Sequence, residues 1–385
     1  MKAETIARWE HKHRAFLMHR LSPKHATWVY SKGRQWFLKK LAAEYPEEIH
    51  PSQGLERKLW GISFRSPLGN AAGMWKNGEA YNVMVAQGAG AYLAGTTTAN
   101  PRKGNKGLPF LPYPLSGAAS NWLGLPNEGD MSVGERLKAY QKVDGCPIGV
   151  SVMRSPDLKG QEQLDRLVRG MYGYMICGVD FIEVNESCPN TRETAGTKDE
   201  VRERLEYLRD HFLCVRDRRL PVIVKFASNT QEEQLPVILD MVLRCGFDGV
   251  NFGNTVTNYN DIRPMIHHAE RGLFEYFVNH IGGGVSGRPL KEMSLRTAAA
   301  AVAYVRACGP DREFHVWRTG GIETGNDIIE SEKAGISMNW WFTGYFNRFA
   351  EVGHRVYQTV YDEFAGRVKN SRLKAVDERK SRESR

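Results

Sequence analysis

A cysteine lies between two asparagines in the segment NESCPNT, residues 185–191. The segment follows the apolar run FIEV and places Cys188 directly before a proline. A thiolate is a nucleophile and a base, so this position suits catalysis. A buried cysteine is equally a small hydrophobe, and Asn and Pro end strands without any chemistry. The rest of the chain must decide between an active-site loop and an ordinary strand end.

Two lysines are candidates for a charged group in a binding site. Lys225 is inside the apolar run VIVKFA, and a buried ammonium requires a partner. That partner is either a carboxylate on a neighbouring strand, such as Glu183, or a group that develops negative charge, such as a reduced flavin. Lys76, in GMWKNGEA, is either a solvated loop residue or a second cation of the same site.

Glycine-rich segments predict a phosphate site. GGGVSG (282–287) and TGG (319–321) are typical of turns near late strands, and Thr343-Gly344 ends the last apolar run. Barrels bind phosphate through backbone N–H groups in such turns. No GxGxxG follows a first strand, which argues against a Rossmann nucleotide site. The six cysteines lack metal-ligand or disulfide spacing, so we predict no metal site and a reducing compartment.

Eight short β-rich runs alternate with helical patterns through most of the chain. Segments 161–176 and 232–246 carry helical periodicity. The alternation predicts an α/β fold, a (β/α)8 TIM barrel, with a doubly wound open sheet as the competing architecture. Most runs end in polar residues or glycine, and in a barrel these ends converge at one mouth. The runs are 67–73, 90–98, 147–153, 181–187, 221–227, 249–255, 313–321 and 337–344.

The two ends of the chain lie outside this pattern. Residues 1–50 hold ten Lys/Arg against five Glu, mixed with aromatic residues, and predict two helices joined at Ser22-Pro23. These helices either pack on the barrel or lie on an anionic membrane surface. We divide the chain into this extension (1–50), the barrel (54–365) and a basic tail (366–385). The composition, 41% hydrophobic and 25% charged with a net charge of +9, is that of a globular protein, and no run reaches the ~18 apolar residues of a membrane-spanning helix.

Taken together and in this order, the segments resemble the dihydroorotate dehydrogenase family, FMN-containing (β/α)8 barrels of pyrimidine synthesis. The resemblance covers residues from about 55 to about 360 and rests on AAGMWKNGEA, GTTTANPRKGN, SNWLGLPNEG, NESCPNT, VIVKFA, NFGNT, GGGVSGRPL and RTGGIETG. It implies oxidation of dihydroorotate to orotate. By the same resemblance, Cys188 removes the proton from C5 while C6 delivers hydride to flavin N5, and Lys225 faces the flavin.

The resemblance also implies two overlapping sets of binding residues. A planar, anionic, amide-rich ring needs one cation and several amide side chains, which the motifs supply. The positions that match the FMN site are Ala72, Gly73, Thr96, Ser151, Asn185, Lys225, Gly287, Gly320, Gly321, Thr343 and Gly344. The positions that match the orotate site are Lys76, Asn121, Asn127, Asn190, Asn254 and Thr255.

The resemblance is mosaic. The N-terminal helices and Lys76 are similar to the membrane-associated, quinone-using branch, whereas Cys188 and Ser151 are similar to the soluble branch. The segment LPFLPYPL (108–115) lacks the arginines that the quinone branch carries near the flavin edge, so quinone remains one candidate acceptor among others. The departures at the site itself are Trp75, Glu186, Arg318 and the pair Trp340-Trp341.

Three functions remain open on the sequence. The first is dihydroorotate oxidation. The second is a related FMN oxidoreductase of another pyrimidine or cyclic amide, with Glu186 and Trp75 changing the specificity. The third is a non-catalytic flavin- or membrane-binding paralogue, or an RNA-binding relative of the FMN barrels that modify tRNA. The catalytic positions are filled and no RNA-binding module follows the barrel, so we expect an enzyme without a nucleic-acid partner, cytoplasmic or peripheral on the inner membrane.

Overall fold

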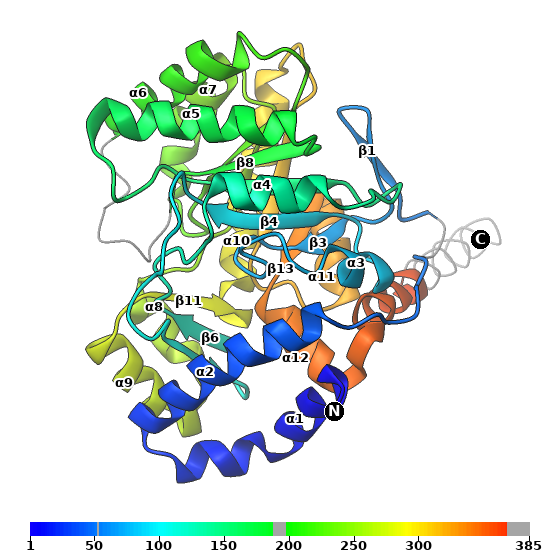
Figure 1. Ribbon diagram of the computed structural model, residues 1–385, viewed down its shortest axis with the longest axis vertical. Helices are drawn as coiled ribbons and strands as arrows, with labels where there is room; N and C mark the ends of the chain where they lie inside the picture. The colour runs from blue at the N-terminus through cyan, green and yellow to red at the C-terminus, as the bar shows by residue number, and fades with distance from the viewer. Residues whose placement is uncertain (52–53, 188–197, 368–385) are drawn as a thin grey trace, which may run out of the picture.

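A closed ring of parallel strands forms the centre of the molecule (Figure 1). The computed structural model describes residues 1–51, 54–187 and 198–367. Within these residues, eight parallel strands pair in the order β3-β13-β12-β10-β9-β8-β7-β4, and a bridge from Gly69 to Ala91 joins β3 to β4. The strands are β3 (Leu68–Asn70), β4 (Tyr92–Thr97), β7 (Ile148–Val152), β8 (Phe181–Asn185), β9 (Val222–Phe226), β10 (Gly249–Phe252), β12 (His315–Thr319) and β13 (Met338–Trp341). Each lies in one of the runs that the sequence predicts, so the (β/α)8 barrel is confirmed and the open sheet is excluded.

Aromatic side chains fill the barrel interior on the side away from the carboxyl ends of the strands. The rings of Phe181 and Trp317 meet edge to face with centroids 5.3 Å apart, and the centroids of Trp317 and Trp340 lie 5.0 Å apart. A hairpin of β1 (Arg57–Leu59) and β2 (Ile62–Phe64) adds Trp60 to the same apolar cluster. Because this cluster occupies the interior, polar inward-facing residues are left to the opposite end, where the strands terminate.

Strand register sets the height of those polar residues. Asn185 on β8 is paired with Lys225 on β9, and Lys225 is paired with Asn251 on β10. All three residues are buried. In parallel strands, paired residues lie at one level, so an amide, an ammonium and a second amide share one layer near the mouth.

Amphipathic helices cover the outside of the barrel, as Figure 1 shows for α4 to α7 above the strands. The two segments with the clearest helical periodicity form α5 (Gly160–Ile176) and α7 (Leu235–Arg244), the latter after a short 3₁₀ turn. Both bury an apolar face against the strands. The remaining helices that cover the barrel or its mouth are α3 (Tyr81–Ala86), α4 (Asp130–Lys138), α6 (Lys198–Leu208), α8 (Tyr259–Ile262), α9 (Arg271–His280), α10 (Lys291–Cys308), α11 (Gly325–Lys333) and α12 (Thr343–Val352).

A small antiparallel sheet beside the mouth differs from the sequence prediction. It contains β5 (Phe110–Tyr113), β6 (Ala118–Asn121) and β11 (Gly284–Gly287), with β6 in the middle. The segment GGGVSG is therefore a turn only at Gly282 and Gly283, and its last four residues, 284–287, are a strand. The prediction of a turn is wrong there because the pairing partner of β11 lies far away in the sequence.

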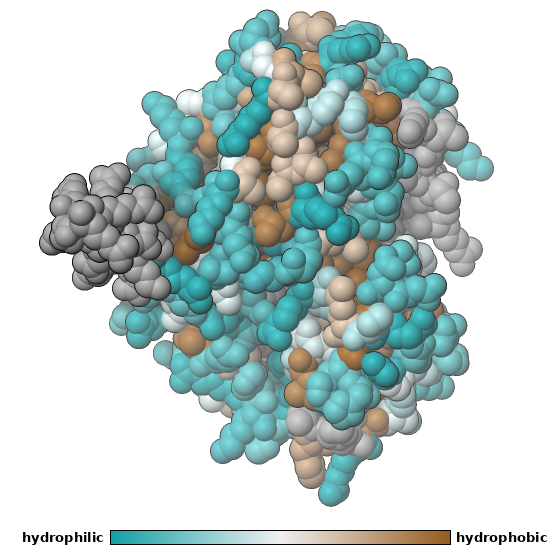
Figure 2. All heavy atoms as spheres, turned by 180° about the vertical axis from the view of Figure 1, so that it is seen from behind, coloured by the Kyte–Doolittle hydropathy of each residue, from teal (hydrophilic) through white to brown (hydrophobic). Residues whose placement is uncertain are grey.

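The N-terminal extension forms the two predicted helices, α1 (Ala3–Arg20) and α2 (Pro23–Ala42). Ser22 caps α2 by accepting a hydrogen bond from the backbone N–H of His25 at 3.4 Å, and Pro23 occupies the first helical position. In Figure 1 the pair lies along one edge of the barrel, with α1 packed on α12 and α2 packed on β5 and α9. No helix within the described ranges is both long and apolar enough to cross a membrane. Seen from behind, the surface is mostly hydrophilic, with smaller apolar areas between charged side chains (Figure 2).

Candidate active site

A cavity opens at the carboxyl ends of the barrel strands and gathers most of the predicted binding residues. Its lining comes from several barrel strands, the small sheet and the start of α12. The predicted residues that line it are Ala72, Gly73, Lys76, Thr96, Asn121, Asn185, Lys225, Asn254, Thr255, Gly287, Gly320, Gly321, Thr343 and Gly344. Segments far apart in the sequence thus converge on one space, as a barrel mouth requires.

Two of the predicted residues do not line this cavity. The side-chain amide of Asn127 donates to Thr98 Oγ1 and to the carbonyl of Leu125, both at 2.9 Å, and so holds its own loop. Ser151 lies one layer behind the cavity, with its Oγ 3.0 Å from Thr96 Oγ1. Two further predicted residues, Cys188 and Asn190, fall outside the described residues.

The amides at the mouth are fixed by one another. Asn185 donates to Thr96 Oγ1 at 3.1 Å, and Asn254 donates to Asn185 Oδ1 at 3.1 Å. Asn254 also donates to the carbonyl of Ser187 at 2.5 Å. These bonds hold both side chains in one orientation, which preorganises a polar wall for a ligand. The sequence prediction did not include Ser187, although it lies inside the quoted NESCPNT segment.

Lys225 has the carboxylate partner that the sequence offers as one alternative, and it also lines the cavity. Its ammonium lies 3.3 Å from Glu183 Oε1 on the neighbouring strand, and it lines the cavity. Glu183 is fully buried, and its other oxygen accepts a hydrogen bond from Asn251 at 2.6 Å. Asn251 in turn accepts from Thr319 Oγ1 at 3.0 Å. A carboxylate with this many partners is a well-held counter-ion for a buried lysine, and the ion pair lies at the cavity floor.

Glycines with left-handed backbone shape the far end of the cavity. Gly287 has φ +100°, and a Cβ there would lie 2.2 Å from the carbonyl oxygen of Gly117. Gly321 has φ +69°, and a Cβ there would lie 2.3 Å from Lys291 Cα. Helix α12 begins at Thr343, at the same end. The bare backbones and the first turn of a helix form a cup with N–H groups available to an anion.

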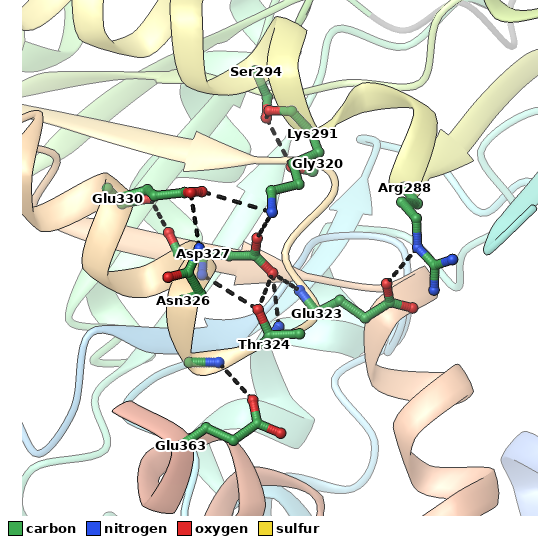
Figure 3. A network of polar contacts seen from close by, with 12 residues as sticks. Arg288, Lys291, Ser294, Gly320, Glu323, Thr324, Asn326, Asp327, Glu330 and Glu363 are labelled. Atoms are coloured by element: carbon green, nitrogen blue, oxygen red, sulfur yellow. Dashed lines mark hydrogen bonds and ion pairs between the residues drawn. The ribbon is translucent and has the colours of Figure 1, made fainter. Parts of the chain in front are cut away.

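A network of charged residues braces this cup (Figure 3). Lys291, at the start of α10, pairs with Asp327 of α11 at 2.7 Å. Asp327 also accepts the backbone N–H of Thr324 at 2.7 Å in a capping box. Arg288 pairs with Glu323 at 2.9 Å. These bonds join the loop after β11 to the loop after β12, which are the two loops that carry the cup glycines.

The lining fits a flavin. The residues offer a glycine cup for a phosphate, a paired cation and a row of amides for a polar ring edge. Thr255 Oγ1 is buried on the cavity lining and has no hydrogen-bond partner among residues 1–51, 54–187 and 198–367, which leaves it as a candidate group for binding a ligand. Among the described residues no cluster of His, Cys, Asp or Glu could hold a metal ion.

Trp75 and Glu186, two residues that depart from the family pattern, make their contacts away from the cavity. Glu186 is buried and pairs with Arg204 of α6 at 2.8 Å. Trp75 is buried in the main apolar core. Neither side chain lines the cavity. Trp340 and Trp341 both line it: Trp340 continues the aromatic floor, and the ring of Trp341 also contacts the rings of Tyr345 and Tyr357.

A second, apolar cavity lies between the N-terminal helices and the barrel. Phe110, Phe342 and Thr343 line both cavities, so these side chains form a shared wall. Arg34 of α2 stacks on the rings of Phe110 and Phe342 and donates to the carbonyl of Gly73 at 3.4 Å. Its Nε is buried and has no hydrogen-bond partner in the part of the chain that the structure describes. Helical periodicity alone did not identify Arg34, because it does not say which helix face meets the barrel.

Comparison with known proteins defines the family. The model of the dihydroorotate dehydrogenase family matches residues 54–364. The dihydroorotate dehydrogenase (quinone) of Corynebacterium diphtheriae is 30% identical over 295 residues, covering 75% of this chain and 74% of that protein. The protein of that name from Bordetella avium is 28% identical over 306 residues, covering 78% and 83%. In fold, a ligand-free dihydroorotate dehydrogenase from Eimeria tenella superposes with a TM-score of 0.73 at 24% identity, covering 89% of this chain and 95% of that one.

The chain therefore belongs to the dihydroorotate dehydrogenase family. Members of this family are oxidoreductases that oxidise dihydroorotate in pyrimidine synthesis, and membership implies a flavin cofactor.

Removing the ammonium of Lys225 should show how strongly a buried, unpaired Glu183 carboxylate destabilises the protein. In Lys225→Met, Glu183 remains buried without its cation, so we expect the free energy of unfolding to fall by about 3–5 kcal/mol. In Lys225→Met/Glu183→Gln most of this loss should return, because the amide keeps the contact with Asn251 and carries no charge. Urea unfolding measures both values.

Lys142→Met serves as the control, since it breaks the exposed pair with Asp180. An exposed pair contributes at most about 1 kcal/mol. Equal losses in the single and the double variant would mean that the Glu183 charge plays no part.

Proposed function

We propose that this protein oxidises dihydroorotate to orotate with FMN and passes the electrons to a quinone. The observation that carries the proposal is the single cavity that joins a cup of glycines, a charge-paired lysine and a wall of amides. Each part matches one part of the two ligands: a phosphate, a reducible ring and an anionic cyclic amide.

FMN is the flavin that suits this cavity. The cup offers backbone N–H groups around Gly287, Gly320 and Gly321 to one phosphate. When bound, the flavin supplies the hydride-accepting ring. Lys225 and the Asn185–Thr96 pair hold its polar edge, and the ammonium favours the negative charge that reduction brings.

A second set of cavity residues would hold the substrate. Lys76 provides a cation for the carboxylate of dihydroorotate, and Asn121, Asn254 and Thr255 provide hydrogen-bonding groups for its amide edges. Asn190 belongs to the same proposed set. Asn127 contributes by shaping its loop, since its amide is already bonded to Thr98 and Leu125.

Cys188 is the proposed base. As a thiolate it takes the proton from C5 of dihydroorotate while the hydride leaves C6, which creates the C5–C6 double bond of orotate. A correctly placed general base contributes about 10²–10⁴ in rate.

Another cyclic amide is the weaker candidate substrate. The case for this substrate depends on Glu186 and Trp75 as residues that change the specificity. The carboxylate of Glu186 is instead bound to Arg204, and Trp75 lies in the core. Neither side chain lines the substrate cavity.

The apolar cavity is the proposed quinone site. Its lining is mostly hydrophobic side chains of α1, α2 and α12, with a polar cluster of Glu10, Arg14 and Tyr30 at its margin. The shared wall of Phe110, Phe342 and Thr343 brings it next to the flavin. Arg34 replaces the arginines missing from LPFLPYPL, because its buried Nε can donate to a quinone oxygen. Burial lowers the pKa of Arg34 to about 10, so it stays protonated at neutral pH.

The outer face of α1 and α2 is the proposed membrane contact. Phe16 and Trp28 are 57% and 63% exposed. Lys24 and Lys32 are exposed one turn on either side of Trp28. Aromatic rings flanked by lysines suit an anionic lipid surface, from which a quinone would reach the cavity. We therefore place the protein peripherally on the cytoplasmic side of the inner membrane.

Mixing the purified protein with L-dihydroorotate under anaerobic conditions tests the reaction. We expect the flavin absorbance to bleach rapidly in stopped-flow measurements. Cys188→Ala should keep its flavin and bleach at least ~100-fold more slowly, because the base is lost. A flavin that stays oxidised in the native protein would contradict the proposed substrate, whereas an unchanged rate in Cys188→Ala would remove only the base.

Reoxidation tests the acceptor separately. Flavin that has been photoreduced without dihydroorotate should be reoxidised by a short-chain ubiquinone, and Arg34→Gln should slow this step at least ~10-fold, the value of one hydrogen bond to a charged donor. Lys32→Gln removes an exposed cation from the same helix and should change nothing. A native protein that a quinone does not reoxidise would exclude the quinone, and equal rates in Arg34→Gln would exclude only the arginine.

Vesicle binding tests the membrane contact. Trp28→Ser should weaken binding to anionic vesicles about tenfold, because one partly inserted ring is lost. Ile176→Ser, at an exposed apolar position on α5, should bind like the native protein. Absence of native binding at low salt would refute the proposal.

A further inference from the structure

Arg318 is a buried cation with neutral partners. It lies on β12 directly before the TGG turn and is 0% exposed. Its guanidinium donates to Ser294 Oγ at 2.9 Å, to the carbonyl of Lys291 at 2.9 Å and to Ser331 Oγ at 3.0 Å, with a longer bond to the carbonyl of Asp327. None of these four acceptors is a carboxylate. A guanidinium is costly to bury in this way, so its position calls for a function.

The side chain points away from the barrel interior and joins two helices. Its neighbours on β12, Trp317 and Thr319, face the aromatic core and the cavity respectively. Lys291 and Ser294 belong to the first turn of α10, whereas Asp327 and Ser331 belong to α11. The planar fork of an arginine can bind acceptors on both helices at once, which a lysine cannot do.

Through α10 the guanidinium reaches the cup. Ser294 Oγ, which accepts from Arg318, donates to the carbonyl of Gly320 at 2.8 Å. Figure 3 shows this bond beside the Lys291–Asp327 ion pair. Gly321 is packed so closely on Lys291 that a Cβ would lie 2.3 Å from Lys291 Cα. A shift of the first turn of α10 would therefore move Gly320, through its bond to Ser294, and Gly321, through its contact with Lys291.

The charge itself also favours an anion at the cup. Burial lowers the pKa of Arg318 to about 10, while the carboxylates of Asp327, Glu330 and Glu292 raise it, so the side chain is protonated at neutral pH. The charge lies in a low-dielectric region, where electrostatic interactions are stronger than in water. It lies two residues before Gly320 in the chain.

We propose that Arg318 is a positioning residue for the cofactor phosphate, holding the cup through Ser294 and the first turn of α10 and adding a positive field behind it. The inference rests on the proposed FMN cofactor. It assigns to Arg318 a selectivity for phosphorylated flavin over the same ring without phosphate.

The test compares FMN with riboflavin, which lacks the phosphate. Flavin is removed from the full-length protein, and each compound is titrated back while its fluorescence is followed. We expect the native protein to bind FMN more tightly than riboflavin. Arg318→Gln should raise the dissociation constant for FMN at least ~10-fold and that for riboflavin no more than about twofold, since only the phosphate contacts change.

Two further variants separate the two contributions and guard against misfolding. Arg318→Lys keeps the charge but not the fork, so its loss of FMN affinity should be intermediate. Ser294→Ala keeps the charge of Arg318 but removes the hydroxyl that joins its guanidinium to the carbonyl of Gly320, and should weaken FMN binding about threefold. If Arg318→Gln does not fold, these two variants decide. Arg312→Gln is the matched control, because Arg312 also donates to backbone carbonyls, of Leu243 and Phe247, before the other end of β12.

Each outcome has one meaning. A loss of FMN preference in the Arg318 and Ser294 variants, but not in Arg312→Gln, supports the inference. Equal weakening of FMN and riboflavin would make Arg318 a structural residue only and overturn the inference. A native protein without any preference for FMN would overturn the proposed cofactor as well.

Discussion

The ion pair between Lys225 and Glu183 is the interaction on which the site depends. A barrel interior is normally filled with apolar side chains, and an ammonium there requires a carboxylate within contact distance. The carboxylate needs partners too, and Asn251 and then Thr319 supply them from the next strands. The aromatic cluster of Phe181, Trp317 and Trp340 fills the volume below. The polar chain is therefore confined to the mouth, where a flavin can use its charge.

An ion pair also supports the glycine cup. Its glycines supply backbone groups but no side chains, so their positions must be set by neighbours. The Lys291–Asp327 pair and the bond from Ser294 to Gly320 do this from outside the barrel. The cavity is thus held from two sides, by strand register at the floor and by helix contacts at the phosphate end.

Much of this arrangement could be predicted from the sequence, and the limits have physical causes. The eight strands were recognisable because their residues are buried on both faces and end in polar groups. The sheet of β5, β6 and β11 was missed because strand pairing between distant segments leaves no local periodicity. Glu186 and Trp75 were misjudged as site residues, since an ion pair with α6 and a place in the core can be seen only in three dimensions. Arg34 was missed for the same reason.

The shared wall of Phe110, Phe342 and Thr343 has an evolutionary consequence. The two cavities are adjacent, yet one is built from barrel loops and the other largely from helices α1 and α2, which add no strand to the ring. Apart from Arg34, which contacts Gly73 of the first cavity, substitutions in the helices can therefore change the lining of the second cavity while leaving the loops of the first unchanged. A chain built this way can change the lining of its second cavity while the barrel loops that form the first cavity stay the same.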